Sequence, residues 1–254
     1  MKYVGQEELK ELKPRKKRYS AVSFVIIFSI ICVIALSLII RLVLNRTKRI
    51  QVSSLKEFNL EEVPDFTGIP YIEINSNKPW FDKDQKNTKA FEEYSDLDSL
   101  GRCGPAMANV CIELMPTEER GEIGMIKPSG WHTVKYDDII EDRYLYNRCH
   151  LIAYSLTGEN ANEKNLITGT RFMNVNGMLP FEIQVANYIR DTNNHVLYRV
   201  TPVFNGKELV ARGVIIEAWS VEDNGRGICF SIFCYNNQPG IKIDYTTGES
   251  HILP

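Results

Sequence analysis

The pattern of hydrophobic and polar positions divides the chain into an apolar N-terminal run and a longer part with alternating character. Ala21 to Ile40 is an uncharged, mostly apolar run of 20 residues, which is about the length that spans a bilayer as a helix. Basic residues flank it on both sides, seven within residues 1–20 and four within 41–50. The denser cluster before the run predicts a cytoplasmic N-terminus and an exported C-terminal part. A cleavable signal peptide is the alternative, but its apolar core is usually shorter and ends at a small-residue site.

Several segments of the longer part alternate apolar and polar residues, the pattern of half-buried strands. Tyr71–Asn75 is the first of them, and the nearly apolar stretch Ala106–Met115 is consistent with a strand that crosses the core. Three longer runs near the C-terminus predict one antiparallel sheet: His195–Phe204, Glu208–Trp219 and Gly227–Tyr235. The expected class is therefore α+β with a central antiparallel sheet, preceded by one transmembrane helix.

Between these runs lies a segment of mixed pattern. Tyr144–Leu151 predicts a strand, and residues 158–165 predict a loop. We expect a short helix over residues 166–174, broken by Gly177 and Pro180, and a second helix over residues 181–191. The predicted domains are a basic tail (1–20), a transmembrane signal-anchor helix (21–44), a tether (45–62) and a folded domain (63–254).

Charge is distributed unevenly along the chain. Residues 1–50 hold 11 Lys and Arg against 3 Asp and Glu, a net charge of +8. The remainder holds 19 basic against 29 acidic residues, a net charge of −10. An acidic domain repels polyanions such as nucleic acid overall, so binding one here would depend on a local basic groove. Candidates for that groove are Arg102, Arg148, Lys164 and Arg171, each of which is by itself an ordinary solvated charge.

The candidate chemistry lies in the middle of the chain, where a histidine is followed by three polar residues: His150, Asn165, Asn174 and Glu182. A neutral imidazole takes a proton from water near pH 7. Amide and carboxylate oxygens are hard ligands that suit a partly hydrated Mg²⁺. These groups suffice for metal-assisted attack of water on a phosphodiester.

This stretch resembles the DNA/RNA non-specific endonucleases of the ββα-metal superfamily, and most closely their Gram-positive, membrane-bound DNA-entry nucleases. The family's Asp-Arg-Gly-His motif appears as Asn147-Arg148-Cys149-His150, and Asn174 matches the Asn that binds Mg²⁺. The resemblance extends from about Val63 to the end and includes residues 101–104, 115–120 and 244–248. It implies the ββα-metal fold, His150 and Arg148 as catalytic residues with His150 as the general base, Asn174 as metal ligand, and Mg²⁺ as cofactor with Mn²⁺ as an alternative.

Two further groups of roles follow from the same resemblance. Asn165, Glu182 and Asn147 are expected to orient the waters of the metal or the substrate, and Arg102 and Arg171 are expected to bind phosphate. Glu182 has a rival role as an acidic residue that opens a helix, and Asn165 has one in fixing its loop.

The chain departs from the motif at two positions. Asn147 replaces the family's Asp and loses a negative charge, and Cys149 replaces its Gly. Because neighbouring residues of a strand point to opposite faces, Cys149 is predicted to be a packed core thiol rather than a nucleophile. Cys103–Cys111 and Cys229–Cys234 are conceivable disulfides.

The expected function is a membrane-anchored, extracellular, sequence-non-specific endonuclease that acts on DNA and on RNA. Its contacts would be with the nucleic-acid backbone, and residues 21–44 would contact the lipid bilayer. A surface receptor that binds DNA during uptake without cleaving it is the alternative from another class. A secreted toxin-like nuclease fits a membrane anchor less well.

Overall fold

The computed structural model describes residues 32, 34–35, 37 and 58–253. The chain divides into two units, Met1–Arg46 and Thr47–Pro254. The fold described below is that of the second unit. Within the described ranges, no helix combines the length and the hydropathy that crossing a membrane requires. The predicted anchor and basic tail lie, apart from four residues, outside these ranges.

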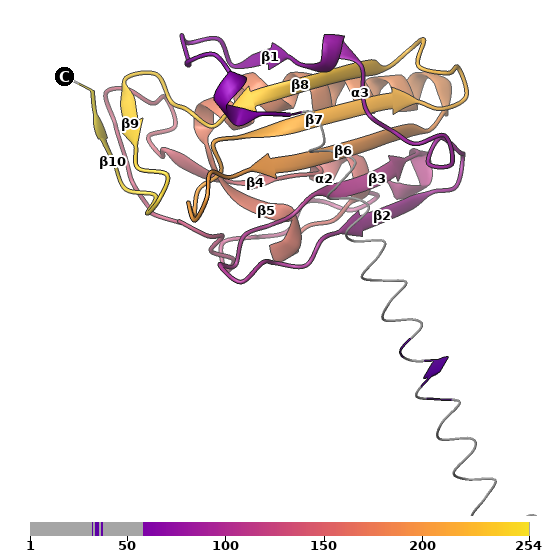
Figure 1. Cartoon of the computed structure of the whole chain (residues 1–254), viewed down its shortest axis with the longest axis horizontal. Helices are drawn as coiled ribbons and strands as arrows, with labels where there is room; N and C mark the ends of the chain where they lie inside the picture. The colour runs from indigo at the N-terminus through magenta and orange to yellow at the C-terminus, as the bar shows by residue number, and fades with distance from the viewer. Residues whose placement is uncertain (1–31, 33, 36, 38–57, 254) are drawn as a thin grey trace, which may run out of the picture. The chain divides into compact units, whose positions relative to one another are not determined.

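A six-stranded antiparallel sheet forms the centre of the domain (Figure 1). The order across it is β1 (Tyr71–Glu73), β8 (Cys229–Tyr235), β7 (Gly213–Ser220), β6 (Val196–Val203), β3 (Ala106–Val110) and β2 (Phe91–Tyr94). The three long C-terminal strands are hydrogen-bonded neighbours, which confirms the predicted antiparallel sheet. Its central strands are buried on both faces, because a layer of protein covers each side.

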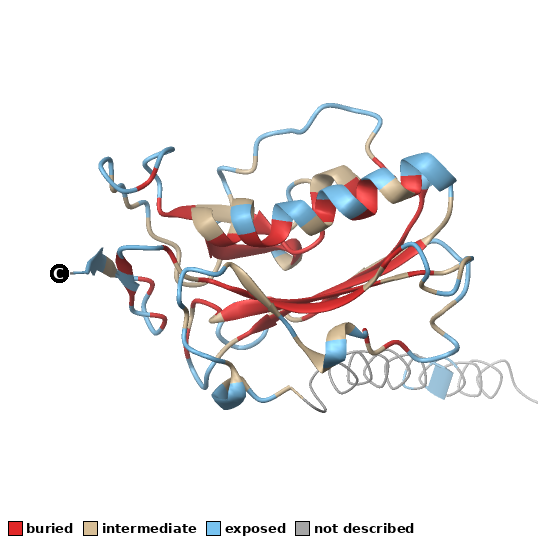
Figure 2. Ribbon diagram, turned by 90° about the horizontal axis from the view of Figure 1, so that it is seen from above, coloured by how far each residue is buried: buried red, intermediate tan, exposed pale blue. Residues whose placement is uncertain are grey.

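Helix α3 (Leu179–Thr192) covers one face of the sheet, with its buried side turned toward the strands (Figure 2). Val185, Ala186 and Ile189 recur at helical spacing and pack into the main core with residues of β3, β6, β7 and β8. Gly177, just before α3, lies close to Cys234 of β8. The helical segment is therefore held against the sheet along much of its length.

The opposite face of the sheet is covered by the segment that precedes β1. Phe58 stacks on Phe233 with ring centroids 5.3 Å apart, and Leu60 and Phe66 join the same cluster. A short 3-10 helix, Leu60–Glu62, is capped by the Asn59 side chain. The predicted tether therefore ends too late, because residues 58–62 already belong to the folded domain.

A separate hairpin leads into the long helix. β4 (Tyr146–His150) pairs antiparallel with β5 (Leu166–Thr170), and a helical run follows at once through the π-helical segment Met173–Met178 into α3. The predicted helix over residues 166–174 is wrong for 166–170, because Ile167, Thr168 and Thr170 are β-branched and complete the hairpin. Residues 171–174 are helical, as predicted. The predicted break is also wrong. Pro180 lies in the first turn of α3, directly after the π-helical segment, and the helical run continues through it.

The remaining elements are short. α2 (Tyr154–Thr157) follows β4, and 3-10 turns are formed by Asn75–Asn77, Ile112–Leu114 and Glu163–Asn165. The hairpin of β9 (Ile241–Ile243) and β10 (Ser250–Ile252) packs on a second small core that includes Leu145 and Tyr146. This second core supports the strand that carries the candidate histidine.

Candidate active site

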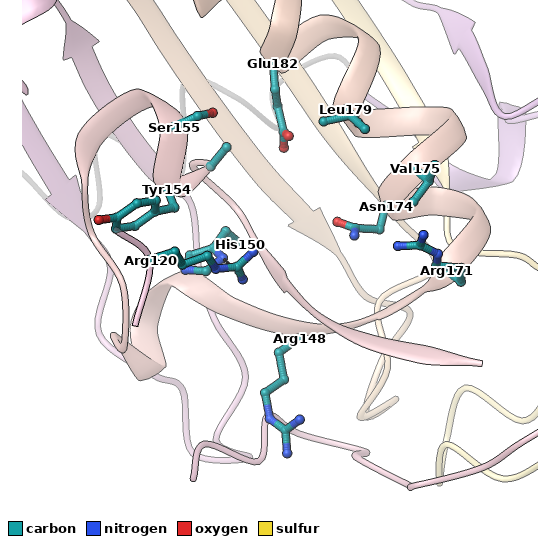
Figure 3. A pocket seen from close by; sticks show the side chains of 11 residues that line it. Arg120, Arg148, His150, Tyr154, Ser155, Arg171, Asn174, Val175, Leu179 and Glu182 are labelled. Carbon is teal, nitrogen blue, oxygen red and sulfur yellow. Dashed lines mark hydrogen bonds between the residues drawn. The ribbon is translucent and has the colours of Figure 1, made fainter. Parts of the chain in front are cut away.

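Most of the predicted site residues line one cavity of about 380 Å³ between the end of β4, α2 and the helical run (Figure 3). Its polar lining is Arg120, Arg148, His150, Tyr154, Ser155, Arg171, Asn174 and Glu182. Three chain segments distant in sequence therefore meet at this cavity. The histidine and the asparagine, which the sequence analysis paired, both line it.

His150 ends β4 and is 7% exposed. Its Nε2 lies 2.8 Å from the carbonyl oxygen of Asn160, and its Nδ1 lies 3.3 Å from the Arg120 guanidinium. Because a carbonyl only accepts hydrogen bonds, Nε2 carries the hydrogen and Nδ1 keeps its lone pair. Nδ1 is therefore the atom of this ring that can accept a proton.

Burial lowers the pKa of His150 to about 4, because water no longer solvates the charged ring. The hydrogen bond to Asn160 opposes this shift, and the positive charge of Arg120 adds to it. The imidazole is therefore neutral at pH 7, as a general base must be before it acts.

Asn174 and Glu182 both face the cavity from one helical run, although they are eight residues apart (Figure 3). Two α-helical turns span about 7.2 residues, so a plain helix would rotate the two side chains out of line. The π-type bond from the Leu179 N–H to the Asn174 carbonyl adds the extra residue. The π segment therefore places the amide and the carboxylate on the same side of the helix.

The amide of Asn174 is oriented by Asn147, whose Oδ1 lies 3.3 Å from Asn174 Nδ2. This contact leaves Asn174 Oδ1 as an acceptor, and no protein donor within residues 58–253 is hydrogen-bonded to it. Asn147, at the motif position where the family has Asp, thus acts on Asn174 through its oxygen, which Asn and Asp share. The loss of negative charge does not remove this contact.

Glu182 is a buried carboxylate in a cavity, and desolvation raises its pKa to about 8 although Arg120 opposes the shift. A desolvated carboxylate beside an amide oxygen suits a hard divalent cation. The described residues contain no cluster of three or more His, Cys, Asp or Glu, so water would supply most ligands of such a cation. A hydrated Mg²⁺ fits that arrangement, because it keeps several of its waters.

Glu182→Gln is expected to stabilise the cation-free protein at pH 8. The folded state binds a proton that the unfolded state releases between pH 4.5 and 8, so the stability due to Glu182 falls as pH rises across that window. The gain at pH 8 should be on the order of 4 kcal/mol in the free energy of unfolding. Urea unfolding in EDTA at pH 5 and pH 8 measures it. The exposed Glu141→Gln should change little, and an equal response of both variants would contradict the burial argument.

The arginines are placed less uniformly than expected. Arg171 lines the cavity beside Asn174 (Figure 3). It also forms an ion pair with Asp142. Arg148 lines the cavity, but its guanidinium points away from His150, donates to the carbonyls of Gly124 and Ile126, and stacks on a tryptophan. Arg148 therefore holds the 124–126 loop, and its guanidinium does not take the catalytic position beside His150 that the resemblance implied.

Arg102 was expected to bind phosphate beside His150, and the structure does not place it there. Its guanidinium pairs with Asp98 and donates to the carbonyl oxygens of Gly206 and Glu208. All of these contacts lie outside the cavity. Arg102 instead ties the loop before β3 to the turn before β7, because a planar guanidinium can bridge several acceptors at once.

Asn165 also has a different role from the one predicted for it. It is fully buried, its Oδ1 accepts from the Ile152 N–H at 2.9 Å, and its Nδ2 donates to the Ile152 carbonyl at 3.0 Å. Both polar atoms of the Asn165 amide are therefore hydrogen-bonded to the backbone of Ile152, two residues after His150. Asn165 fixes the turn that follows the base, which was its alternative role, and it does not line the cavity.

Cys149 is buried and points away from the cavity, as the alternation along the strand predicted. A Cβ built on Gly169 would lie 2.3 Å from its Sγ and 2.7 Å from the Met173 side chain. Because Gly169 of β5 has no side chain, the Cys149 thiol can occupy the space next to it. Desolvation raises the pKa of Cys149 well above its usual value, so the thiol is unreactive. Neither conceivable disulfide forms, since all described cysteines are free.

Arg120 is the charged residue of the cavity that the sequence pattern did not reveal; Tyr154 and Ser155 also line the cavity and were not predicted. Arg120 contacts His150 and is the charge that opposes the shift of Glu182. It follows the 3-10 turn after β3, 30 residues before the histidine, in a loop without regular pattern. The one available signal was its place at the end of Met115–Arg120, a stretch that carried the family resemblance.

Comparisons with known proteins identify the family of the chain. The family model described as DNA/RNA non-specific endonuclease matches residues 83–222, more than half of the chain. A deoxyribonuclease of Streptococcus dysgalactiae subsp. equisimilis is 34% identical over 110 residues, which are 41% of this chain and 32% of that protein. The chain thus matches about a third of the length of that curated relative.

Two solved structures share the fold. NucA from Streptococcus agalactiae, solved with a magnesium ion bound, superposes with a TM-score of 0.65 and 26% identity, covering 76% of this chain and 91% of that one. The Sda1 nuclease, solved with a bound zinc ion, gives a TM-score of 0.59 and 25% identity over 78% and 100% of the two chains. On the match over residues 83–222, the chain belongs to the DNA/RNA non-specific endonuclease family.

Proposed function

We propose that this protein is a divalent-cation-dependent endonuclease that hydrolyses phosphodiester bonds of DNA, and of RNA, without sequence preference. The observation that carries the proposal is one cavity lined by a neutral histidine, an amide oxygen and a desolvated carboxylate. Family membership supports the same chemistry.

In the proposed reaction, His150 Nδ1 takes a proton from a water molecule as its oxygen attacks phosphorus. The Asn160 carbonyl holds Nε2–H and keeps the ring in the required tautomer. The new P–O bond forms as the bond to the 3′ oxygen breaks, and the leaving oxygen takes a proton from solvent. The products are a 5′-phosphate and a 3′-hydroxyl.

The arginines prepare the phosphate for this attack. Arg120 donates to Nδ1, so it would leave the ring for a phosphate oxygen as Nδ1 accepts the proton of the water. Arg171 is the second candidate for that oxygen, since its side chain lies beside Asn174. Contacts of this kind are with the backbone, which explains the absence of sequence preference.

Asn174 would hold the divalent cation directly and Glu182 would hold its waters. When bound, the cation supplies Lewis-acid stabilisation of the charge that develops on the phosphate and on the leaving oxygen. We propose Mg²⁺, with Mn²⁺ as an alternative, because an amide, a carboxylate and water are hard oxygen ligands. NucA, with its magnesium ion, supports this choice, whereas Sda1 was solved with zinc.

We also propose that residues 21–44 anchor the protein in the cell membrane, with the nuclease domain outside. The support is the uncharged 20-residue run and the denser basic cluster before it. A DNA receptor without catalysis remains the alternative function, and metal-dependent turnover separates the two.

The pH dependence of the reaction tests the role of His150. The pKa of the imidazole lies at about 4, so kcat/KM at saturating Mg²⁺ should stay high down to about pH 5 and fall as His150 becomes protonated near pH 4. Arg120→Gln removes a charge that lowers this pKa and should move the acid limb to higher pH. NMR titration of the imidazole gives the same pKa directly.

Arg226→Gln is the matched control, because this arginine lies in the exposed turn before β8. Its profile should coincide with that of the unmodified protein. An acid limb near pH 6.5 in the unmodified protein, unmoved by Arg120→Gln, would contradict a buried histidine base beside an arginine.

A further inference from the structure

A second cavity of about 540 Å³ adjoins the active-site cavity. The two share Asn174 and the side chains of Arg120, Arg148 and Arg171. His150 and Glu182 line only the first cavity. Asn174 and the arginines therefore mark the boundary between the cavity that contains the proposed general base, His150, and the cavity that does not.

The second cavity combines aromatic rings with positive charge. Trp131, Tyr144 and Tyr146 contribute to its lining, and the Arg148 guanidinium lies 4.1 Å from the centre of the Trp131 ring. Tyr146 is buried, and its hydroxyl donates to the Gly248 carbonyl. Tyr144 is different because it is 42% exposed, so its ring is accessible to a ligand.

The backbone at Tyr144 is fixed without help from its side chain. Tyr144 pairs with Lys135 in an isolated β-bridge, and the next residue, Leu145, donates to the Val134 carbonyl. The Lys135 ammonium lies 4.8 Å from the centre of the tyrosine ring. An exposed aromatic ring on a rigid backbone, among cations, is the arrangement that binds unpaired nucleobases by stacking.

The position of the cavity determines which nucleotide it can take. In-line displacement puts the attacking water and the leaving oxygen on opposite sides of the phosphorus. With the water at His150 in the first cavity and the phosphate at the Asn174 boundary, the leaving 3′ oxygen points toward the second cavity. The nucleoside that carries this oxygen lies on the 5′ side of the scissile phosphate.

We propose that the second cavity is a nucleobase subsite in which Tyr144 stacks on the base immediately 5′ of the scissile phosphate. The inference rests on the proposed function and adds a substrate preference to it. A base within an intact duplex is stacked and paired and cannot enter a cavity without leaving the helix. The enzyme should therefore favour single-stranded or locally unpaired nucleic acid over duplex.

The test uses single-stranded oligonucleotides with one cleavable phosphodiester among methylphosphonate linkages. One substrate has every base, one lacks the base on the 5′ side of the cleavable bond, and one lacks the base on its 3′ side. Loss of the 5′ base should lower kcat/KM by roughly 5- to 100-fold, as expected for losing one base–aromatic stack. Loss of the 3′ base should have a much smaller effect.

Variants connect this preference to the tyrosine. Tyr144→Ala should cleave the complete substrate as slowly as the unmodified enzyme cleaves the one without the 5′ base. Tyr144→Phe keeps the ring and should restore the preference. Ile139→Ala is the matched control, since it truncates a similarly exposed apolar side chain of the same segment outside the cavity.

The outcomes are distinct. Equal cleavage of the three substrates, or a preference that persists in Tyr144→Ala, would overturn the subsite and leave the proposed function intact. If only loss of the 3′ base lowered kcat/KM, the assignment of the subsite to the nucleotide on the 5′ side of the scissile phosphate would be overturned. No cleavage of unmodified single-stranded or duplex DNA with Mg²⁺ would overturn the proposed function, and the subsite with it.

Discussion

Replacing His150 with alanine is expected to reduce kcat for plasmid cleavage by about 10²- to 10⁴-fold, the range typical of a general base. The imidazole is neutral at pH 7, and its Nδ1 lone pair is the proton acceptor in the cavity. The variant should remain folded, because the ring contributes one hydrogen bond to a loop carbonyl and belongs to no core cluster. Steady-state cleavage and thermal unfolding measure the two effects.

The control for this variant is His251→Ala, which removes an exposed histidine of β10. It should cleave at the unmodified rate. Added imidazole should partly restore cleavage by His150→Ala, because a small base can enter the vacated space. A folded His150→Ala variant that cleaves at more than a tenth of the unmodified rate would exclude His150 as the base.

Asn174→Ala should lower cleavage at a fixed Mg²⁺ concentration by more than about 100-fold, since even residues that only orient metal ligands typically contribute 10- to 100-fold. The amide oxygen is the direct ligand that we assign to the protein. Asn174→Asp retains an oxygen at this position and should retain far more activity. The measurement is the rate of plasmid cleavage as a function of Mg²⁺ concentration.

Asn187→Ala on the exposed side of α3 is the matched control and should leave the Mg²⁺ dependence unchanged. In Asn174→Ala, by contrast, half-maximal cleavage should require much more Mg²⁺. If both variants reached half-maximal rate at the Mg²⁺ concentration of the unmodified protein, Asn174 would not be a metal ligand.

The sheet was predictable from sequence, because strands that are buried in a core carry many apolar residues within a short segment. The three C-terminal runs carry an apolar pattern that local reading detects, and β6, β7 and β8 follow it with shifts of a few residues at their ends. The predicted and observed ends of the strands differ most next to the segments that connect them. Glu208–Arg212, for example, was predicted to be part of a strand but forms an irregular segment whose ends are joined by an ion pair.

The helical run was misread because two local signals conflicted with the tertiary structure. β5 is short and needs β4 as its partner, so its strand character depends on residues far along the chain. Gly177 and Pro180 usually end helices, but here a π-type turn precedes α3 and places Pro180 in its first turn. A pattern of period 3.6 cannot predict such a turn.

The candidate site was predicted in part. His150 and Asn174 came from the motif and line one cavity, and so does Glu182. Arg102 was predicted from a stretch that carries the resemblance, and Asn165 from its place shortly after the motif. The polar atoms of both residues bind backbone groups outside the cavity. Which partner a long polar side chain selects depends on loops whose course the sequence pattern does not determine.

The most direct test of the account is the incubation of the protein with supercoiled plasmid DNA, with Mg²⁺ or with Mg²⁺ and excess EDTA. We expect nicked and linear products with Mg²⁺, none with EDTA, and cleavage by His150→Ala with Mg²⁺ that is at least about 100-fold slower. DNA that is bound but remains intact in every sample would contradict the nuclease and favour the receptor.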